Sequence, residues 1–123
     1  MQSNSFFKFT NVAEGEPDDR QALSVTSIEL RDIDMTGYIS LLDEFRNLVF
    51  ARVISCKIRS LQTLPTFRRL VVLDLQDNRI QKLGSPQFWG AMPHLSVLNL
   101  IHNEIQDKNE LGNLRTLRNL VVL

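Results

Sequence analysis

The sequence has little of several features that would point to a particular class of protein. Its single cysteine, Cys56, excludes an internal disulfide and favours a reducing compartment. It has no run of eighteen apolar residues, so it predicts no membrane-spanning helix. Basic and acidic residues number 14 each, which gives no excess positive charge for a nucleic acid partner. The start lacks a signal-peptide pattern, so we expect a cytoplasmic location, in the sense that includes nucleus and cilium.

Motifs of catalysis and of metal binding are missing as well. Glycine-rich phosphate loops, H-E-x-x-H and G-x-S-x-G are absent. His94 and His102 have no carboxylate or cysteine at ligand spacing, and the acidic run within residues 14–19 lacks the spacing of a calcium loop. We therefore expect no enzyme activity, no cofactor and no metal site.

What the sequence does contain is one apolar pattern written several times. Residues 70–80 and 95–105 share Leu-x-x-Leu-x-Leu-x-x-Asn-x-Ile. Weaker copies begin at Val25 and Leu48, and a further one begins at Leu120, so successive copies are 23, 22, 25 and 25 residues apart. Repeats of this length predict a solenoid, in which each unit stacks only on its neighbours.

The spacing within the pattern explains why it recurs. The Leu-x-Leu pair has a period of two, so both leucines point to the same face of a short strand. Parallel strands stacked about 4.8 Å apart join these leucines into one apolar wall. Asn78 and Asn103 fall where a buried amide can bond the backbone of neighbouring turns, and Cys56 takes that position in the second repeat. Ile33 does not fit, so the first repeat is either an atypical end unit or shifted by one residue.

Segments between the strands predict short helical turns. Ser85 and Pro86 predict an N-cap and the first position of a helix. Residues 107–110 resemble a capping box, and residues 37–48 also predict a helix. In the shortest repeat, a spacing of three predicts 3₁₀-like turns at Leu61, Leu64 and Phe67.

This pattern resembles the leucine-rich repeat, and the match covers about residues 25–123. The resemblance implies an α/β solenoid with a parallel β-sheet on the concave face and short helices or 3₁₀ turns on the convex face. We expect about five repeats of the intracellular type, the last incomplete. Residues 1–24 would form an N-terminal cap, with their phenylalanines covering the first repeat, or an arm that grips a partner. Because the sequence stops within a repeat, we expect a longer parent protein or a partner at that end.

Residues 70–105 show a narrower resemblance. The Phe88-Trp89 pair, followed by His102 just before Asn103, is similar to the leucine-rich-repeat and IQ-motif proteins of cilia and flagella. This resemblance implies a structural subunit of a large assembly such as the axoneme, with calmodulin bound through regions outside this chain, since no IQ motif is present. The repeats are also similar to the phosphatase-regulator and tubulin-associated types. That second resemblance implies a regulatory adaptor that binds a protein such as protein phosphatase 1 in the concave face.

The strand residues that alternate with the buried leucines are the candidate partner-binding residues, because they face solvent on the concave side. They are Phe50, Arg52, Ile54, Val72, Asp74, Gln76, Val97, Asn99, Ile101 and Val122.

Two columns of these residues suggest different uses. Phe50, Val72, Val97 and Val122 would form an apolar patch, and contiguous exposed apolar surface tends to mark a binding site. The alternative is that β-branched residues simply suit strands, or that the Phe-rich arm covers them. The middle column, with Glu29 and Arg52 at its start, would be either a ladder of weak exposed ion pairs or a recognition stripe for a polar peptide.

Overall fold

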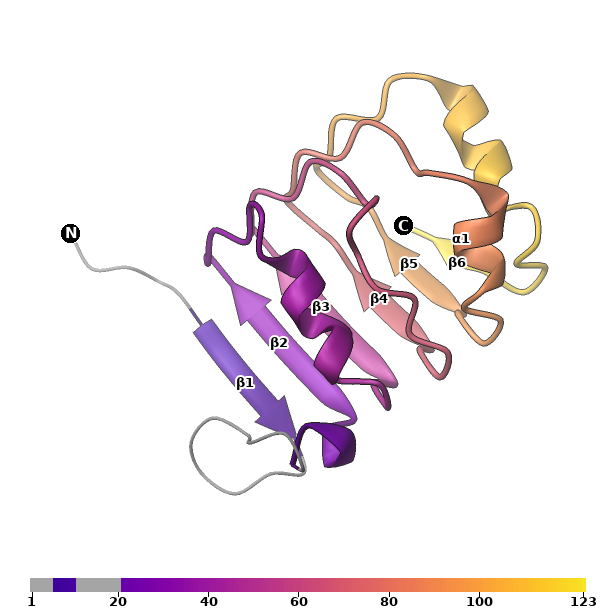
Figure 1. Cartoon of the computed structure of the whole chain (residues 1–123). Coiled ribbons are helices and arrows are strands. Elements are labelled where there is room, and N and C mark those ends of the chain that lie inside the picture. Colours follow the sequence, from indigo (N-terminus) through magenta and orange to yellow (C-terminus); the bar gives the residue numbers. More distant parts are fainter. Residues whose placement is uncertain (1–5, 11–20) are drawn as a thin grey trace.

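The computed structural model describes residues 6–10 and 21–123, and for residues 6–10 and Gln21 only the backbone. These residues build one six-stranded sheet whose strands follow the order of the chain (Figure 1). The strands are β1 (Phe6–Thr10), β2 (Ser27–Arg31), β3 (Phe50–Ile54), β4 (Val72–Asp74), β5 (Val97–Asn99) and β6 (Val121–Val122). Strands β2 to β6 are parallel, which confirms the predicted parallel sheet.

Pairing between the strands confirms the predicted register over the first four repeats. Leu73 lies opposite Leu98 on β5 and opposite Ala51 on β3. In the first repeat Ile28 lies opposite Ala51, so that repeat is not shifted. Ile33 therefore occupies the position equivalent to Cys56, and the first repeat is an atypical unit in the expected register.

The prediction for the last strand is wrong by one residue. Val121, and not Val122, lies opposite Val97, while Val122 lies opposite Leu98. Strand β6 has two residues, both exposed, and it pairs with β5 alone. Burial of one face is what fixes the register of the inner strands, and β6 lacks that constraint.

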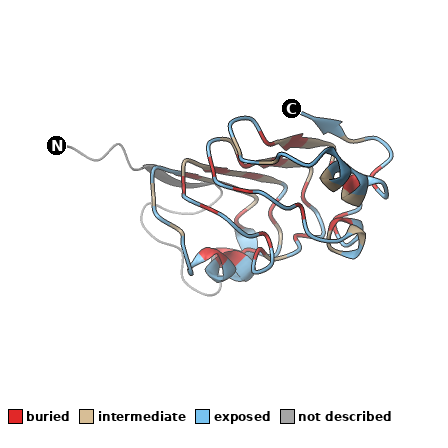
Figure 2. Cartoon of the chain, turned by 90° about the horizontal axis from the view of Figure 1, so that it is seen from above, coloured by how far each residue is buried: buried red, intermediate tan, exposed pale blue. Residues whose placement is uncertain are grey.

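Short helical segments lie on one side of the sheet (Figure 2). The other side of the sheet, which no helical segment covers, is called the open face. They are η1 (Gln21–Ser24), η2 (Ile39–Glu44), α1 (Pro86–Gly90) and η3 (Lys108–Leu114), of which only α1 is an α-helix. As predicted, the Ser85 side chain caps α1 by accepting a hydrogen bond from the Phe88 N–H (3.2 Å). The helix expected over 37–48 is shorter and of the 3₁₀ type. Residues 61–70 form hydrogen-bonded turns, with Leu64 N–H donating to the Leu61 carbonyl.

The predicted capping box is confirmed at Asp107 and wrong at Glu110. Asp107 caps η3 by accepting from the Asn109 N–H (2.9 Å). Glu110, however, accepts a hydrogen bond from the Leu83 N–H of the preceding repeat (2.8 Å). The carboxylate therefore joins two repeats and does not close its own helix.

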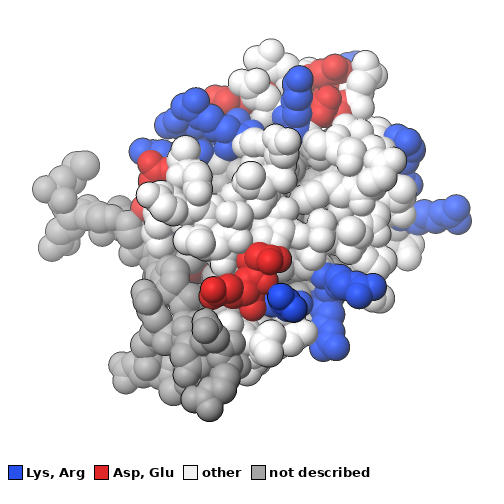
Figure 3. All heavy atoms as spheres, in the orientation of Figure 1, with Lys and Arg blue, Asp and Glu red and all other residues white. Residues whose placement is uncertain are grey.

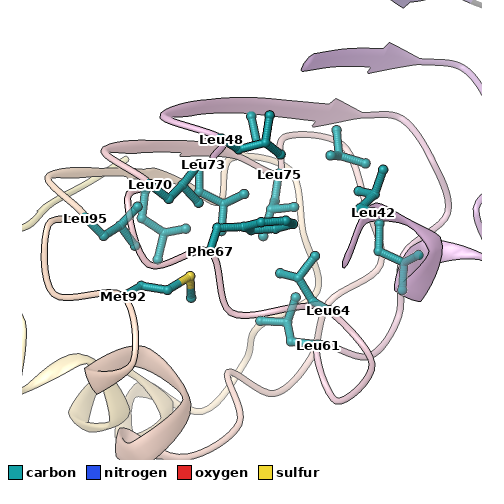
Figure 4. Packing of buried hydrophobic residues seen from close by; sticks show 14 of the residues in the cluster. Leu42, Leu48, Leu61, Leu64, Phe67, Leu70, Leu73, Leu75, Met92 and Leu95 are labelled. Carbon is teal, nitrogen blue, oxygen red and sulfur yellow. The ribbon is translucent and has the colours of Figure 1, made fainter. Parts of the chain in front are cut away.

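The core fills the space between the sheet and the helical side. Leu70, Leu73 and Leu75 from β4 and its flanks are completely buried, and Phe67 lies beneath them (Figure 4). Trp89 is also completely buried and donates its indole N–H to the Leu83 carbonyl (2.6 Å). Phe88 packs edge-on against Trp89, with ring centroids 5.0 Å apart. Packing in the core therefore accounts for the Phe-Trp pair.

Strand β1 extends the sheet at its N-terminal edge. It runs antiparallel to β2, with Phe6 opposite Arg31 and Thr10 opposite Ser27. The first repeat thus has a further strand beside it, as a cap would provide. The phenylalanine side chains of β1 and the acidic run within residues 14–19 lie outside the described residues, so the choice between cap and arm stays a prediction. In the described part of the chain, no helix is long and apolar enough to cross a membrane.

Candidate protein-binding surface

A left-handed residue follows the strand in each of the first four repeats and turns the chain away from the sheet. These residues occupy one repeat position and have φ of 55–58°: Asp32, Ser55, Asp77 and His102. Aspartate and histidine tolerate this conformation better than most side chains. The next residue then points inward, which is where the pattern has Asn78, Asn103 and Cys56.

Asn78 connects two adjacent repeats of the solenoid through its side-chain amide. Its oxygen accepts hydrogen bonds from the Cys56 and Ile58 N–H groups (3.0 and 3.1 Å). Its nitrogen donates to the carbonyls of Val53, Leu75 and Gln76 at 2.8–3.2 Å. The residue is 6% exposed, so these backbone groups have no water as an alternative partner. The role predicted for Asn78 has this structural basis.

Asn103 and Cys56 fill the same position with fewer bonds. Asn103 accepts from the Ile80 N–H (3.0 Å) and donates to the carbonyls of Leu75 and Leu100. The Cys56 thiol lies 3.2 Å from the Ile54 carbonyl, and the residue is completely buried. Burial raises the pKa of this thiol, so its reactive thiolate is disfavoured. Its environment is that of a structural residue.

Three apolar side chains lie in register on the open face of the sheet. Phe50 pairs with Val72, and Val72 pairs with Val97. All three are half-buried, while the residues that follow each of them in the strand are completely or almost completely buried. We call Phe50, Val72 and Val97 the apolar row. The structure thus brings together three of the four residues of the predicted patch, and Val121 takes the fourth place by register.

Polar residues beside the apolar row are bonded to one another. Arg52 lies 4.0 Å from the Asp74 carboxylate, and its guanidinium stacks over the Phe50 ring at 4.7 Å. Asn99 donates to the side chain of Gln76 (3.3 Å). In the first repeat, Glu29 forms its ion pair with Arg31 of its own strand (2.8 Å), where the sequence predicted a ladder continuing to Arg52.

Two residues at the next outward-facing repeat position add further apolar surface, whereas Gln76 at that position is polar. Ile54 is half-buried and Ile101 is 40% exposed. Apart from Val122, which pairs with Leu98, the predicted site residues are therefore the outward-facing ones of their repeats, and Arg52, Asp74 and Asn99 lie between the two positions that carry the apolar residues.

Two solvent-accessible valines directly before strands β3 and β4 were missed by the sequence reasoning. Val49 is 39% exposed and Val71 is half-buried, each directly before a member of the apolar row. The Val49 carbonyl accepts from both Val71 N–H and Val72 N–H (2.8 and 3.2 Å), a bifurcation found where the strand begins. Strict alternation would assign these valines to the buried face. The Val-Val doublet at 71–72 was the available signal.

The histidines do not build a metal site within the described residues, where no group of three metal-ligating side chains occurs. His102 lies 3.2 Å from the Asp77 carboxylate through its Nδ1. Both residues are the left-handed residues of adjacent repeats, so this contact ties one turn to the next.

Comparison with known proteins agrees with this architecture. The model of the leucine-rich-repeat family matches residues 68–122. A curated relative, the acidic leucine-rich nuclear phosphoprotein 32 family member A of Drosophila melanogaster, is 32% identical over 104 residues. That match covers 85% of this chain and 39% of the relative, so the chain spans well under half of the relative's length.

Two solved structures share the fold. Internalin C2 of Listeria monocytogenes is 28% identical with a TM-score of 0.55, over 69% of this chain and 35% of that one. A chain of the Drosophila melanogaster SNF/U2A' complex is 24% identical with a TM-score of 0.59, over 77% of this chain and 55% of that one. Together with the repeated strands, the ladder asparagines and the helical outer side, these matches identify the chain as a member of the leucine-rich-repeat proteins.

Proposed function

We propose that this chain is a non-catalytic protein-binding scaffold and that its partner contacts the apolar row, Phe50, Val72 and Val97. One observation carries the proposal: these side chains stand in register on a face turned to solvent. Contiguous apolar surface on a solvent-facing side of a sheet tends to mark an interaction site.

The polar neighbours of the row favour the same surface. Arg52, Asp74, Gln76 and Asn99 already have partners within the chain. A protein that covers the row would therefore remove apolar surface from water while these side chains keep their hydrogen bonds within the chain. Each half-buried valine or phenylalanine that becomes fully buried contributes about 1 kcal/mol.

Aspartate substitutions in the row test this proposal. Val72→Asp with Val97→Asp places two charges where the partner would exclude water, so we expect the proteins co-purified with the full-length parent chain to be lost. Leu41→Asp is the matched control, because Leu41 is exposed on η2, on the opposite side of the solenoid. The measurement is affinity purification from ciliated and unciliated cells, with circular dichroism of each variant.

Two results would contradict the proposal. Retention of the same partners by the double variant would mean that the row is not their binding surface. Loss of the folded far-UV signal would mean that these valines support the fold. The milder Val97→Thr variant would then decide, because it must keep the fold and weaken partner binding if the row is the binding surface.

The kind of assembly is a separate part of the proposal. We favour an adaptor that binds a protein partner, because the Phe88-Trp89 pair that suggested an axonemal subunit is explained by core packing. His102, the other element of that resemblance, contacts Asp77. An axonemal subunit would remain with the assembly through high-salt extraction. A soluble protein that captures a phosphatase would support the adaptor.

A further inference from the structure

A second surface lies outside the open face and concentrates positive charge. It is a groove of about 920 Å³, within the ~300–1,000 Å³ typical of ligand sites. Its walls come from the segments that follow the ladder positions of the second, third and fourth repeats. The charged residues that line it are Arg59, Arg79, Lys82 and Glu104.

Unequal repeat lengths create this groove. The second repeat is the shortest at 22 residues and has no helix between its strand and β4. The third repeat is 25 residues long and carries α1, whose Ser85 and Phe88 form one wall of the groove. In Figure 1, the connection between β3 and β4 has no helix, whereas the next connection, between β4 and β5, contains α1.

The positive charges of the groove outnumber the carboxylates that line it. In the described part of the chain, no ion pair within 4.0 Å involves Arg59, Arg79 or Lys82. Three cations against one carboxylate give the groove a net positive lining in a chain whose overall charge is zero. Clustered like charges repel one another, so folding stability does not account for them.

Positive potential also extends to the neighbouring repeat. Hydrogen bonds from Thr36, and after them the charges of Lys57 and Arg79, hold the pKa of Asp34 below its usual value. Lys57 lies 3.9 Å from Asp34. Figure 3 shows lysine and arginine side chains gathered, with some acidic ones, along the upper edge of the molecule.

We propose that this groove binds an extended acidic segment of a partner protein, whose carboxylates contact Arg59, Arg79 and Lys82. Gln62, Gln81 and the hydroxyls of Ser60 and Ser85 offer further hydrogen-bond donors along the walls. Phe88 offers a partly buried apolar contact. A nucleic acid fits less well, because phosphate-backbone binding normally rests on a basic excess over the whole domain, and this chain has none.

Neutralising charges of either sign in the groove tests the proposal with the intact chain. The probes are a fluorescent peptide of alternating Asp and Ser, its Asn and Ser counterpart, and an oligothymidylate, followed by fluorescence anisotropy at low ionic strength. Arg79→Gln with Lys82→Gln should weaken binding of the acidic peptide about tenfold. Glu104→Gln should strengthen that binding about twofold to threefold, because it removes the one repulsive carboxylate of the lining.

Arg68→Gln with Arg69→Gln is the matched control, since it removes the same charge from exposed residues outside the groove. We expect this control to bind the acidic peptide nearly as well as the unchanged chain. Equal weakening by both double variants would overturn the proposal, as would equal binding of the Asn and Ser peptide. Preference for the oligothymidylate with the same dependence on Arg79 and Lys82 would overturn the peptide assignment. None of these variants alters the apolar row, so the two surfaces are tested independently.

Discussion

At the scale of single residues, Asn78 shows how one side chain holds a repeat in place. An asparagine amide both donates and accepts, so it can bond backbone N–H and C=O groups at the same time. Asn78 does this for groups from two adjacent repeats, whereas the Cys56 thiol is a weak donor whose partner carbonyls, those of Ile54 and Leu30, lie 3.2 and 3.6 Å away. The asparagine therefore links the backbones of the two repeats, which the cysteine in the equivalent position does less strongly.

Replacing Asn78 with alanine should be severely destabilising. The substitution leaves buried groups of Cys56, Ile58 and Val53 without their partners, each at about 1–3 kcal/mol. We expect a loss of about 3–5 kcal/mol in the free energy of unfolding, measured by urea denaturation.

Asn103→Ala provides the comparison, because Asn103 is only half-buried and water can replace some of its bonds. Its expected cost is about half that of Asn78→Ala. If the two substitutions destabilised the chain equally, burial would not be the reason for the importance of Asn78.

At the scale of elements, the strands were predictable because the alternation of apolar residues in the sequence corresponds to the alternation of buried and solvent-facing side chains. The Leu-x-Leu pairs of β4 and β5 lie side by side with both leucines inside. The same rule failed at β6, where no buried face fixes the register and Val122 is displaced by one residue. It also missed Val49, since alternation does not extend to the residue before a strand.

Helical segments and surfaces were predictable to different degrees. The Ser85 cap was evident from sequence, whereas the 3₁₀ form of η2 depends on packing that a local pattern does not contain. The apolar row followed from the period of two. The groove did not, because it depends on how a repeat of 22 residues sits beside one of 25 residues.

Leu73 offers a direct test of the strand register. It is completely buried and lies between Ala51 and Leu98 on adjacent strands. Leu73→Ala should therefore cost about 2–5 kcal/mol in the free energy of unfolding. Val72→Ala, one residue away on the open face, should cost about 1 kcal/mol or less.

Urea denaturation of both variants measures this difference. Should Leu73→Ala lose less than about 1 kcal/mol, or should Val72→Ala be the more damaging change, the assignment of inner and outer faces would be reversed.

At the scale of the whole molecule, the solenoid is a stack in which each strand contacts only its immediate neighbours. Helix α1 likewise contacts η3 of the next repeat. Stability in such a stack is the sum of each repeat and its interfaces, so a repeat with two neighbours is held more firmly than one with a single neighbour. Strand β4 has paired neighbours on both sides, and β6 has one.

Hydrogen exchange should reveal this difference in stability between β4 and β6. Leu75 N–H donates to the Asn99 carbonyl and Val121 N–H donates to the Ser96 carbonyl, both at 2.9 Å. Because the two bonds are equally short, bond length predicts equal protection, whereas stacking predicts that Val121 exchanges orders of magnitude faster. Leu75 should open only with the central repeats, while Val121 should open by local fraying of β6. Equal rates for the two amides would show that the repeats unfold as one cooperative unit, and the additive description of this solenoid would then be wrong.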